Sequence, residues 1–149
     1  MNYRDAKYDD YQIFLDIGKK IHSLSVYNNM SFSQRKVFTL FASYLENKSR
    51  FFCKIAESNS KPAGVIFGKL MAPVYSEQLM ACDVFFWVES SIRKNGIATN
   101  LIDLFIGWAL ANKAKYIQLQ NGAGIINDLS NLFDRSGLIK TGELYGVSA

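Results

Sequence analysis

The stretch that decides the fold covers residues 88–99. It reads Val88-Glu89-Ser90-Ser91-Ile92-Arg93-Lys94-Asn95-Gly96-Ile97-Ala98-Thr99. An apolar, strand-like run ends at Val88, a short polar turn follows, and the small residues Gly96 and Ala98 open a helical pattern. The first N–H groups of a helix have no partner within it and lie at the positive end of its dipole. Arg93 and Lys94 add positive charge beside this junction. The stretch therefore predicts an anion site suited to a phosphate, between a strand and a helix.

The segments beside this turn set the topology. Residues 79–88 are apolar enough for a strand covered on both faces, residues 96–112 form a helix with apolar side chains on nearly all sides, and residues 116–120 form another strand. A strand–helix–strand crossover predicts that the two strands are parallel. Before it, residues 50–57 and 63–71 flank a turn and predict an antiparallel hairpin.

The outer segments complete the expected order. Residues 3–6 predict a short first strand, and two amphipathic helices follow it. We expect Asp9 or Asp10 to cap the first helix and Ser31 or Ser33 to cap the second. A short helix capped by Asn127 or Asp128 and a last strand over residues 138–147 end the chain. The pattern predicts a mixed sheet covered by helices.

Composition narrows the class of protein. The chain has 149 residues, 49% of them hydrophobic and 20% charged, which fits one packed domain over residues 1–149. The net charge of +4 is scattered, which argues against a nucleic-acid partner and favours a mixed surface. Cys53, Cys82 and the single His22 lie too far apart for metal-ligand spacing, so we expect no metal. With neither a signal peptide nor an apolar run of about 20 residues, we expect a cytoplasmic protein that does not insert into membranes.

The turn also resembles a known family. Arg93-x-x-Gly96-x-Ala98 is similar to the Arg/Gln-x-x-Gly-x-Gly/Ala signature of the GNAT acyltransferases, and Val88 ends a strand five residues before the Arg, as in that family. Ser90 stands where the family often has Pro. The resemblance covers nearly the whole chain: residues 3–10, 62–68 and 127–138 are similar to the family's opening, hairpin and closing elements. The chain most resembles small GNAT proteins of bacteriophages.

This resemblance implies an α/β fold with a mixed, mostly antiparallel sheet, whose central parallel strand pair splays apart, and with helices on its faces. It implies acetyl-CoA as cosubstrate, with the pantetheine arm in the gap between the two strands and the diphosphate on the turn. The implied cofactor contacts are Phe86, Trp87, Val88, Arg93, Lys94, Asn95, Gly96, Ile97, Ala98, Thr99 and Asn127.

The implied reaction is transfer of an acetyl group to a primary amine of a small molecule or peptide, by direct attack in a ternary complex. The resemblance also implies a homodimer. Two other interpretations stay open: a non-catalytic module that binds CoA or a protein, and an acyltransferase acting on a nucleic acid. Residues 27–33, 72–78 and 121–126, expected to border the acceptor, carry no recognisable chemistry.

Several residues are candidates for catalysis or substrate binding. Many GNAT members have a Tyr acid where this chain has Phe133. Asp83 lies inside an apolar strand, where burying a carboxylate costs free energy unless it has a partner or a catalytic role. It is therefore either a base or a structural carboxylate. Tyr145 is either an acid beside the acceptor or an edge-strand aromatic. His22 and Tyr27 are candidate substrate contacts, although a solvated or capping role for His22 is the simpler interpretation.

Overall fold

The computed structural model describes residues 1–92, 96–120 and 129–148. Its elements, in chain order, are β1 (Asn2–Asp5), η1 (Tyr8–Asp10), α1 (Tyr11–Leu24), α2 (Gln34–Glu46), β2 (Phe51–Ser58), β3 (Lys61–Met71), β4 (Met80–Val88), η2 (Ser90–Ile92), α3 (Ile97–Ala111), β5 (Tyr116–Gln118) and α4 (Ser130–Arg135). The expected order is confirmed as far as α4. The strand expected over residues 138–147 is wrong, because residues 138–148 have no regular secondary structure.

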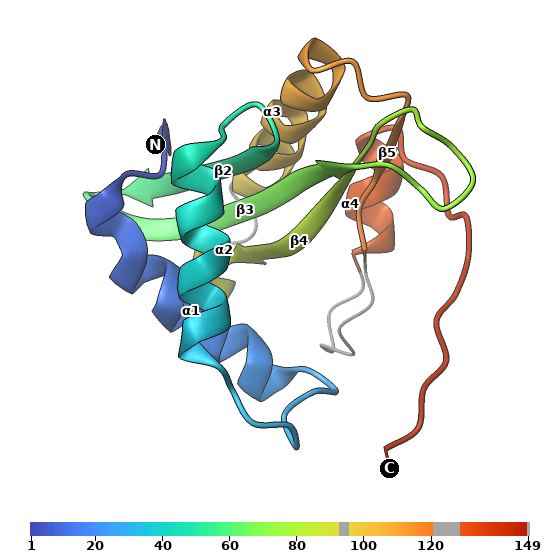
Figure 1. Ribbon diagram of the computed structural model, residues 1–149. Helices are drawn as coiled ribbons and strands as arrows, with labels where there is room; N and C mark the ends of the chain where they lie inside the picture. Colours follow the sequence, from blue (N-terminus) through green and yellow to red (C-terminus); the bar gives the residue numbers. More distant parts are fainter. Residues whose placement is uncertain (93–95, 121–128, 149) are drawn as a thin grey trace.

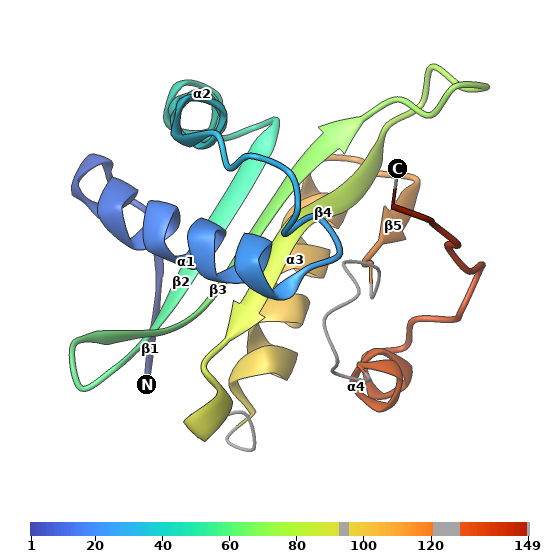
Figure 2. The same ribbon diagram turned by 90° about the horizontal axis from the view of Figure 1, so that it is seen from below.

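One sheet organises the molecule, with strand order β1-β2-β3-β4-β5. Neighbouring strands are antiparallel except for β4 and β5, which are parallel as the crossover predicts. Helices α1 and α2 cover one face of this sheet and α3 covers the other, as Figures 1 and 2 show. The predicted fold class is thus confirmed.

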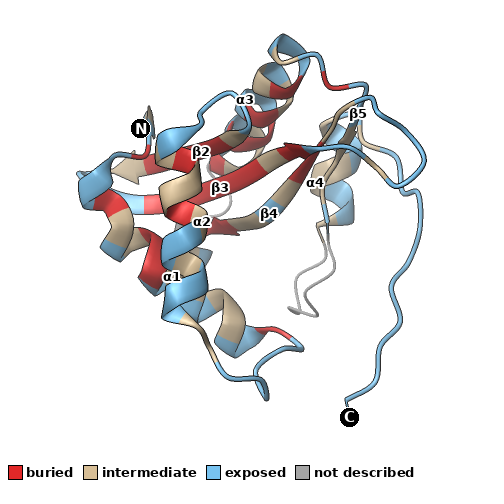
Figure 3. Ribbon diagram, in the orientation of Figure 1, coloured by how far each residue is buried: buried red, intermediate tan, exposed pale blue. Residues whose placement is uncertain are grey.

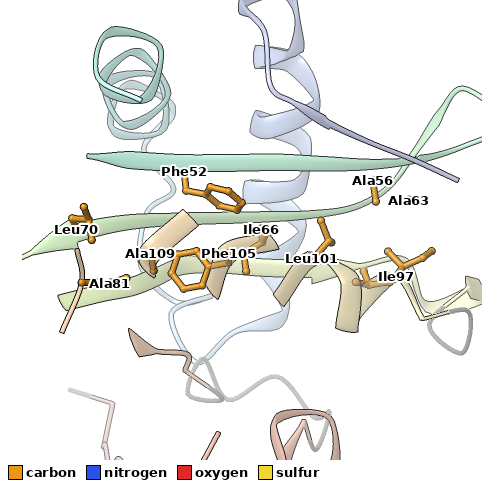
Figure 4. Close-up of a cluster of buried hydrophobic side chains, with 12 residues drawn as sticks. Phe52, Ala56, Ala63, Ile66, Leu70, Ala81, Ile97, Leu101, Phe105 and Ala109 are labelled. Atoms are coloured by element: carbon orange, nitrogen blue, oxygen red, sulfur yellow. The ribbon is translucent and has the colours of Figure 1, made fainter. Parts of the chain in front are cut away.

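The core consists of two hydrophobic clusters separated by the sheet. On the α3 face, Phe52, Ile66 and Phe105 pack together, and Figure 4 shows these side chains meeting between the strands and the helix. On the other face, the Phe14 ring of α1 lies with its centroid 4.7 Å from that of Phe85 and 5.1 Å from that of Phe67. The buried positions concentrate on β2, β3 and β4 in Figure 3, so these strands form the rigid centre of the molecule.

The start of α1 differs from the expected cap. The Asp10 carboxylate does not bond to an N–H of α1, and instead it accepts the Lys7 N–H at 2.7 Å and two N–H groups of Arg4 at 2.6 and 2.8 Å. The Arg4 guanidinium also lies 2.7 Å from Glu57 on β2. Hydrogen bonding to Arg4 holds the pKa of Asp10 below its ordinary range. The helix start is therefore tied to the sheet by an ion pair. The second helix follows the prediction, because the Ser33 side chain accepts the Lys36 N–H.

A β-bulge interrupts the pairing of β3 with β4. Phe67 lies opposite Phe85, but Gly68 lies opposite Asp83, so Val84 is an additional residue in β4. A bulge bends its strand and increases its twist. The pairing of β4 with β5 ends directly before it, at Cys82 and Gln118. Within the described residues, β4 therefore continues for residues 83–88 without a partner strand on the β5 side, and the predicted divergence of the two strands is confirmed.

Gly68 is a position where any side chain would collide with α3. A Cβ on Gly68 would lie 2.2 Å from Cε2 of Phe105, whose side chain is fully buried. We expect Gly68→Ala to lower the free energy of unfolding by about 1–3 kcal/mol, because neither the ring nor the strand has room to move. Urea denaturation measures this change.

Gly107→Ala serves as the matched control, since nothing lies within 4 Å of a Cβ at this position of α3. It should stabilise the protein by about 0.5–1 kcal/mol, because Ala is the better helix former. Equal effects of the two substitutions would show that the contact with Phe105 does not constrain the fold.

Candidate functional site

The first part of the candidate site is the N-terminus of α3. Gly96 is its N-cap, with φ of +73°, a left-handed conformation that glycine adopts without strain. The first helical hydrogen bond runs from the Asn100 N–H to the Gly96 carbonyl at 3.0 Å. The N–H groups of Ile97, Ala98 and Thr99 precede that bond and point out of the helix end. Among the residues that the structure describes, nothing lies within 4 Å of a Cβ built on Gly96, so none of them covers the surface here.

The side chain of Ile97 anchors this end of the helix. It is fully buried in the cluster beneath α3, whereas Ala98 and Thr99 are partly exposed. Arg93, Lys94 and Asn95, which were predicted to contact the same anion, lie outside the described residues, as does Asn127. The described part of the predicted phosphate turn is thus a rigid helix end with outward N–H groups.

The second part of the site is the point where β4 and β5 separate. Oδ1 of Asp83 accepts the backbone N–H of Gln120 at 2.9 Å, directly beyond the last paired residues. Burial raises the pKa of Asp83 to about 7, and the Gln120 hydrogen bond opposes that rise only in part. Asp83 lies opposite Gly68, whose Cα faces Phe105, so its side chain is on the α3 face of the sheet.

The end of β4 forms one wall of the gap. Trp87 is buried in the cluster under α1 and α2, and Val88 is buried in the cluster under α3. Phe86 is half-buried against the α3 cluster. These side chains hold the strand from both faces, so any cofactor contact by residues 86–88 is through the backbone.

A link between α1 and the turn was not predicted from the sequence. Lys20 Nζ lies 3.0 Å from Oε2 of Glu89 and 4.8 Å from the centroid of the Trp87 ring. Oε1 of Glu89 accepts the backbone N–H of Ser90 at 3.0 Å. The Lys20 hydrogen bond lowers the pKa of Glu89. Lys20, Trp87 and Glu89 border a hollow of about 290 Å³ between α1, the start of β3 and the end of β4. Glu89 therefore joins the first helix to the start of the turn.

The remaining candidates do not gather around Asp83. His22 lies in the last turn of α1, with its ring centroid 5.4 Å from that of Phe32. Tyr27 is 52% exposed in the connection between α1 and α2, the two helices that cover the sheet face opposite to α3. Tyr145 is 89% exposed and donates its hydroxyl proton to Glu143. Because residues 138–148 form no strand, the placement of Tyr145 on an edge strand is wrong.

Across residues 1–92, 96–120 and 129–148, His, Cys, Asp and Glu do not gather in threes where they could hold a metal ion. In the same ranges, none of the helices has the length and apolar character needed to cross a membrane.

The sequence and the fold both match known proteins. Residues 19–126 match the model of the acetyltransferase (GNAT) family. A predicted acetyltransferase from Clostridium acetobutylicum, solved with acetyl-CoA, aligns with a TM-score of 0.77 at 21% identity, over 99% of this chain and 95% of that chain. Glucosamine-6-phosphate N-acetyltransferase from Arabidopsis thaliana aligns with a TM-score of 0.75 at 10% identity, over 99% and 97%. The aminoglycoside 6'-N-acetyltransferase AAC(6')-IG from Acinetobacter haemolyticus aligns with a TM-score of 0.72 at 18% identity, over 100% and 98%. No match is found among curated proteins.

The raised pKa of Asp83 predicts a pH-dependent stability. In the folded chain the Asp83 carboxyl keeps its proton up to about pH 7, whereas the ordinary pKa of an aspartate is 3.8. The protonated Asp83 side chain makes its full contribution to stability at pH values below its pKa in the unfolded chain. This contribution is lost as the pH rises through the pKa of Asp83 in the folded chain. We expect Asp83→Asn to raise the free energy of unfolding at pH 8, by at most about 4 kcal/mol, and to change it little at pH 4.

Urea denaturation at the two pH values measures this difference. Asp103→Asn, the same substitution at an exposed position of α3, controls for the loss of one negative charge. A stabilisation of the Asp83→Asn protein that is equal at pH 4 and pH 8 would contradict the raised pKa of the half-buried Asp83 carboxylate.

Proposed function

This chain belongs to the GNAT acetyltransferase family, and we propose that it transfers an acetyl group from acetyl-CoA to a primary amine. The observation that carries the proposal is the separation of β4 from β5 beside the open N-terminus of α3. Together they give a slot between two strands that leads to an anion-binding helix end. The continuous five-stranded sheet supports residues 1–149 as a single acyltransferase domain.

The proposed cofactor site follows the chain from β4 into α3. The diphosphate of CoA accepts hydrogen bonds from the N–H groups of Ile97, Ala98 and Thr99, a favourable place for an anion. In the proposal, Arg93, Lys94 and Asn95 also contact the diphosphate. Asn127 is a further proposed contact to CoA. The pantetheine arm lies beside the backbone of residues 86–88. The acetyl-CoA in the Clostridium structure supports the choice of cosubstrate.

The proposed chemistry is direct attack on the thioester. The neutral amine nitrogen bonds to the acetyl carbon, the carbon–sulfur bond breaks, and CoA leaves as a thiolate. A thiol has a pKa near ~8.5, so this leaving group needs less help from an acid than the amine needs from a base. Asp83 receives the amine proton through water, and a pKa of about 7 suits a base at neutral pH. Tyr145 is the alternative hydroxyl group, and its exposure favours Asp83 for the main role.

The acceptor is proposed to be a small-molecule or peptide amine that approaches from the α1–α2 connection. His22 and Tyr27 are the proposed contacts there, and residues 25–33 carry no charged side chain. The aminoglycoside acetyltransferase among the structural neighbours supports a small-molecule amine. The scattered charge does not support a nucleic-acid acceptor, and the spacing of Cys53, Cys82 and His22 does not support a metal cofactor. A cytoplasmic location and the likeness to bacteriophage proteins, which rest on the sequence, and a homodimer, which rests on the family resemblance alone, complete the proposal.

The rival function is a non-catalytic module that binds CoA. It is favoured by Phe133, which occupies the position of the usual Tyr acid and has no proton to donate. This module would bind CoA with the same turn and show no turnover with any amine. Binding and turnover are therefore measured separately.

The cofactor site is tested by two substitutions of nearly equal size at Gly96. Gly96→Asp places a negative charge against the proposed diphosphate, and we expect calorimetry to show CoA affinity lost while the thermal transition remains. Gly96→Asn is the matched control, because Asn tolerates a positive φ and carries no charge. Its affinity should stay closer to that of the unmodified protein. Equal CoA affinity in both variants would overturn the assignment of this turn.

Catalysis is tested by release of free thiol from acetyl-CoA with a panel of polyamines, amino acids, peptides and aminoglycosides. With an accepted amine, we expect Asp83→Asn to lower kcat by ~10²–10⁴-fold, with CoA binding intact. The unmodified enzyme should gain activity as the pH rises through about 7, where Asp83 loses its proton, and the variant should lack this inflection. Tyr145→Phe should lower kcat if Tyr145 assists. Full activity in both variants would show that the enzyme relies on positioning alone.

A further inference from the structure

Basic residues occur along the whole chain, but their excess over acidic residues is confined to one segment. Residues 17–45 carry four basic side chains and no acidic one, and this equals the net charge of +4 of the whole chain. Outside this segment, acidic and basic residues are equal in number. Lys19 and Lys20 lie near the end of α1, Arg35 and Lys36 lie in the first turn of α2, and all four are exposed. The connection between the two helices is therefore flanked by positive charge.

The connection itself presents apolar side chains to water. Val26, Tyr27 and Met30 are exposed by 57%, 52% and 62%. Ser25 beneath them is buried, and its hydroxyl donates to the His22 carbonyl at 2.9 Å and accepts the Tyr27 N–H at 3.2 Å. The Met30 N–H donates to the Tyr27 carbonyl at 2.9 Å. Hydrogen-bonded turns thus hold these side chains outward, and an exposed apolar surface with a polar rim is typical of a binding site.

This surface lies on the side of the molecule that leads to the gap between β4 and β5. Figures 1 and 2 both place the connection toward β4 and away from β1. Val84, the additional residue of β4 next to Asp83, is 40% exposed. A ligand that reaches from the connection to Asp83 therefore meets apolar side chains at both ends.

Polycationic amines are a poor match for this surface. Spermidine or an aminoglycoside carries several positive charges and needs carboxylates along its binding surface, and residues 17–45 supply none. The four basic side chains repel such a ligand and attract an anionic one, over a screening distance of about 8 Å at physiological ionic strength. The apolar side chains stabilise only a ligand with an apolar body. Charge and hydropathy therefore select a ligand that is both apolar and anionic.

We infer that the acceptor is a primary amine with an apolar side chain and an anionic group, as in an apolar α-amino acid. Its side chain packs on Val26 and Met30, its carboxylate lies toward Arg35 and Lys36, and its amine nitrogen lies toward Asp83. Attack on the thioester gives the N-acetyl amino acid and the CoA thiolate, and the amine proton passes to Asp83 through water. This inference rests on the proposed acetyl transfer and names the acceptor class of that same site.

Amines of different charge separate the acceptor classes in the thiol-release assay with acetyl-CoA. Phenylalanine and phenethylamine share the ring and the primary amine and differ in the carboxylate, whereas spermidine has several positive charges and no ring. We expect kcat/KM to fall in the order phenylalanine, phenethylamine, spermidine. A higher kcat/KM for spermidine or for an aminoglycoside than for phenylalanine would overturn the inference.

A charge reversal tests the role of the basic side chains. In Arg35→Glu, Lys36→Glu the new carboxylates suit the N-terminal end of α2, so the helix is retained. We expect kcat/KM to fall ~10-fold for phenylalanine and to rise for spermidine, because the charge of a site changes the rate of ligand capture. Lys61→Glu, Lys115→Glu is the matched control at exposed positions outside residues 17–45, and it should keep the order of the amines. Structural damage lowers both values, so an order that stays the same in the charge-reversed variant contradicts the inference.

The apolar contact is tested by one pair of substitutions. Met30 is 62% exposed and Leu110 on α3 is 61% exposed, so Met30→Gln and Leu110→Gln remove similar apolar surface at two places. We expect Met30→Gln to raise the KM for phenylalanine about threefold with kcat retained, and Leu110→Gln to leave both unchanged. Equal KM values in the two variants would rule out the proposed contact.

Binding measurements keep this inference separate from the proposed function. If none of the amines is acetylated, the acetyl-transfer proposal fails, and calorimetry with the CoA-loaded chain still decides the class of ligand. Tighter binding of phenylalanine than of spermidine, lost in the Arg35→Glu, Lys36→Glu variant, supports the inference, and the opposite order overturns it. Binding to anionic lipid vesicles, with the same amine preference in both proteins, would assign the surface to a membrane and also overturn it.

Discussion

The close approach of α3 to β3 is the constraint on which the rest of the structure depends. The Phe105 ring occupies the space that a side chain on Gly68 would need, and Gly64 lies beside Leu101 in the same way, one turn of the helix earlier. These contacts fix the height and direction of α3 over the sheet. Because the Ile97 side chain is buried at the start of α3, the free N–H groups of the first helical turn are held next to the end of β4. The position of the proposed anion site is therefore a consequence of core packing.

The gap between β4 and β5 has a local cause. Gly68 opposes Asp83 and Phe67 opposes Phe85, so the additional residue Val84 bends β4 where its pairing with β5 ends. The carboxylate of Asp83 accepts the Gln120 N–H just beyond the last backbone pair. This N–H has no partner on β4 once the strand pairing ends, and the carboxylate supplies its acceptor. The same bond places a titratable group at the entrance of the gap. The structural and the chemical interpretation of Asp83 are thus compatible, because the Gln120 hydrogen bond uses only Oδ1 of the carboxylate.

Much of this could be predicted from the sequence, and the failures have a common physical reason. The hydrophobic periodicity and the turn residues predicted the order of the elements. The crossover from residues 79–88 to residues 116–120 predicted a parallel pair of strands. The bulge at Val84 could not be predicted, because it depends on how Gly68 meets Phe105 across the core. The pairing of Lys20 with Glu89 spans 69 positions and has no local signal. The segment over residues 138–148 has strand character, but a strand exists only with a partner, and no local pattern supplies one.

The Lys20–Glu89 pair shows how the two sides of the molecule are coupled. With side chains 47% and 38% exposed, an ion pair of this kind contributes about 0–1 kcal/mol to stability, so it is not retained to hold the fold together. Its geometry is more informative, because Lys20 contacts the Trp87 ring while Glu89 holds the N–H of Ser90. The pair therefore joins α1 to Glu89 and Ser90, the first residues of the segment that leads to α3. Since α1 also ends at the connection proposed to meet the acceptor, the same helix borders the proposed acceptor region and the start of the proposed cofactor turn.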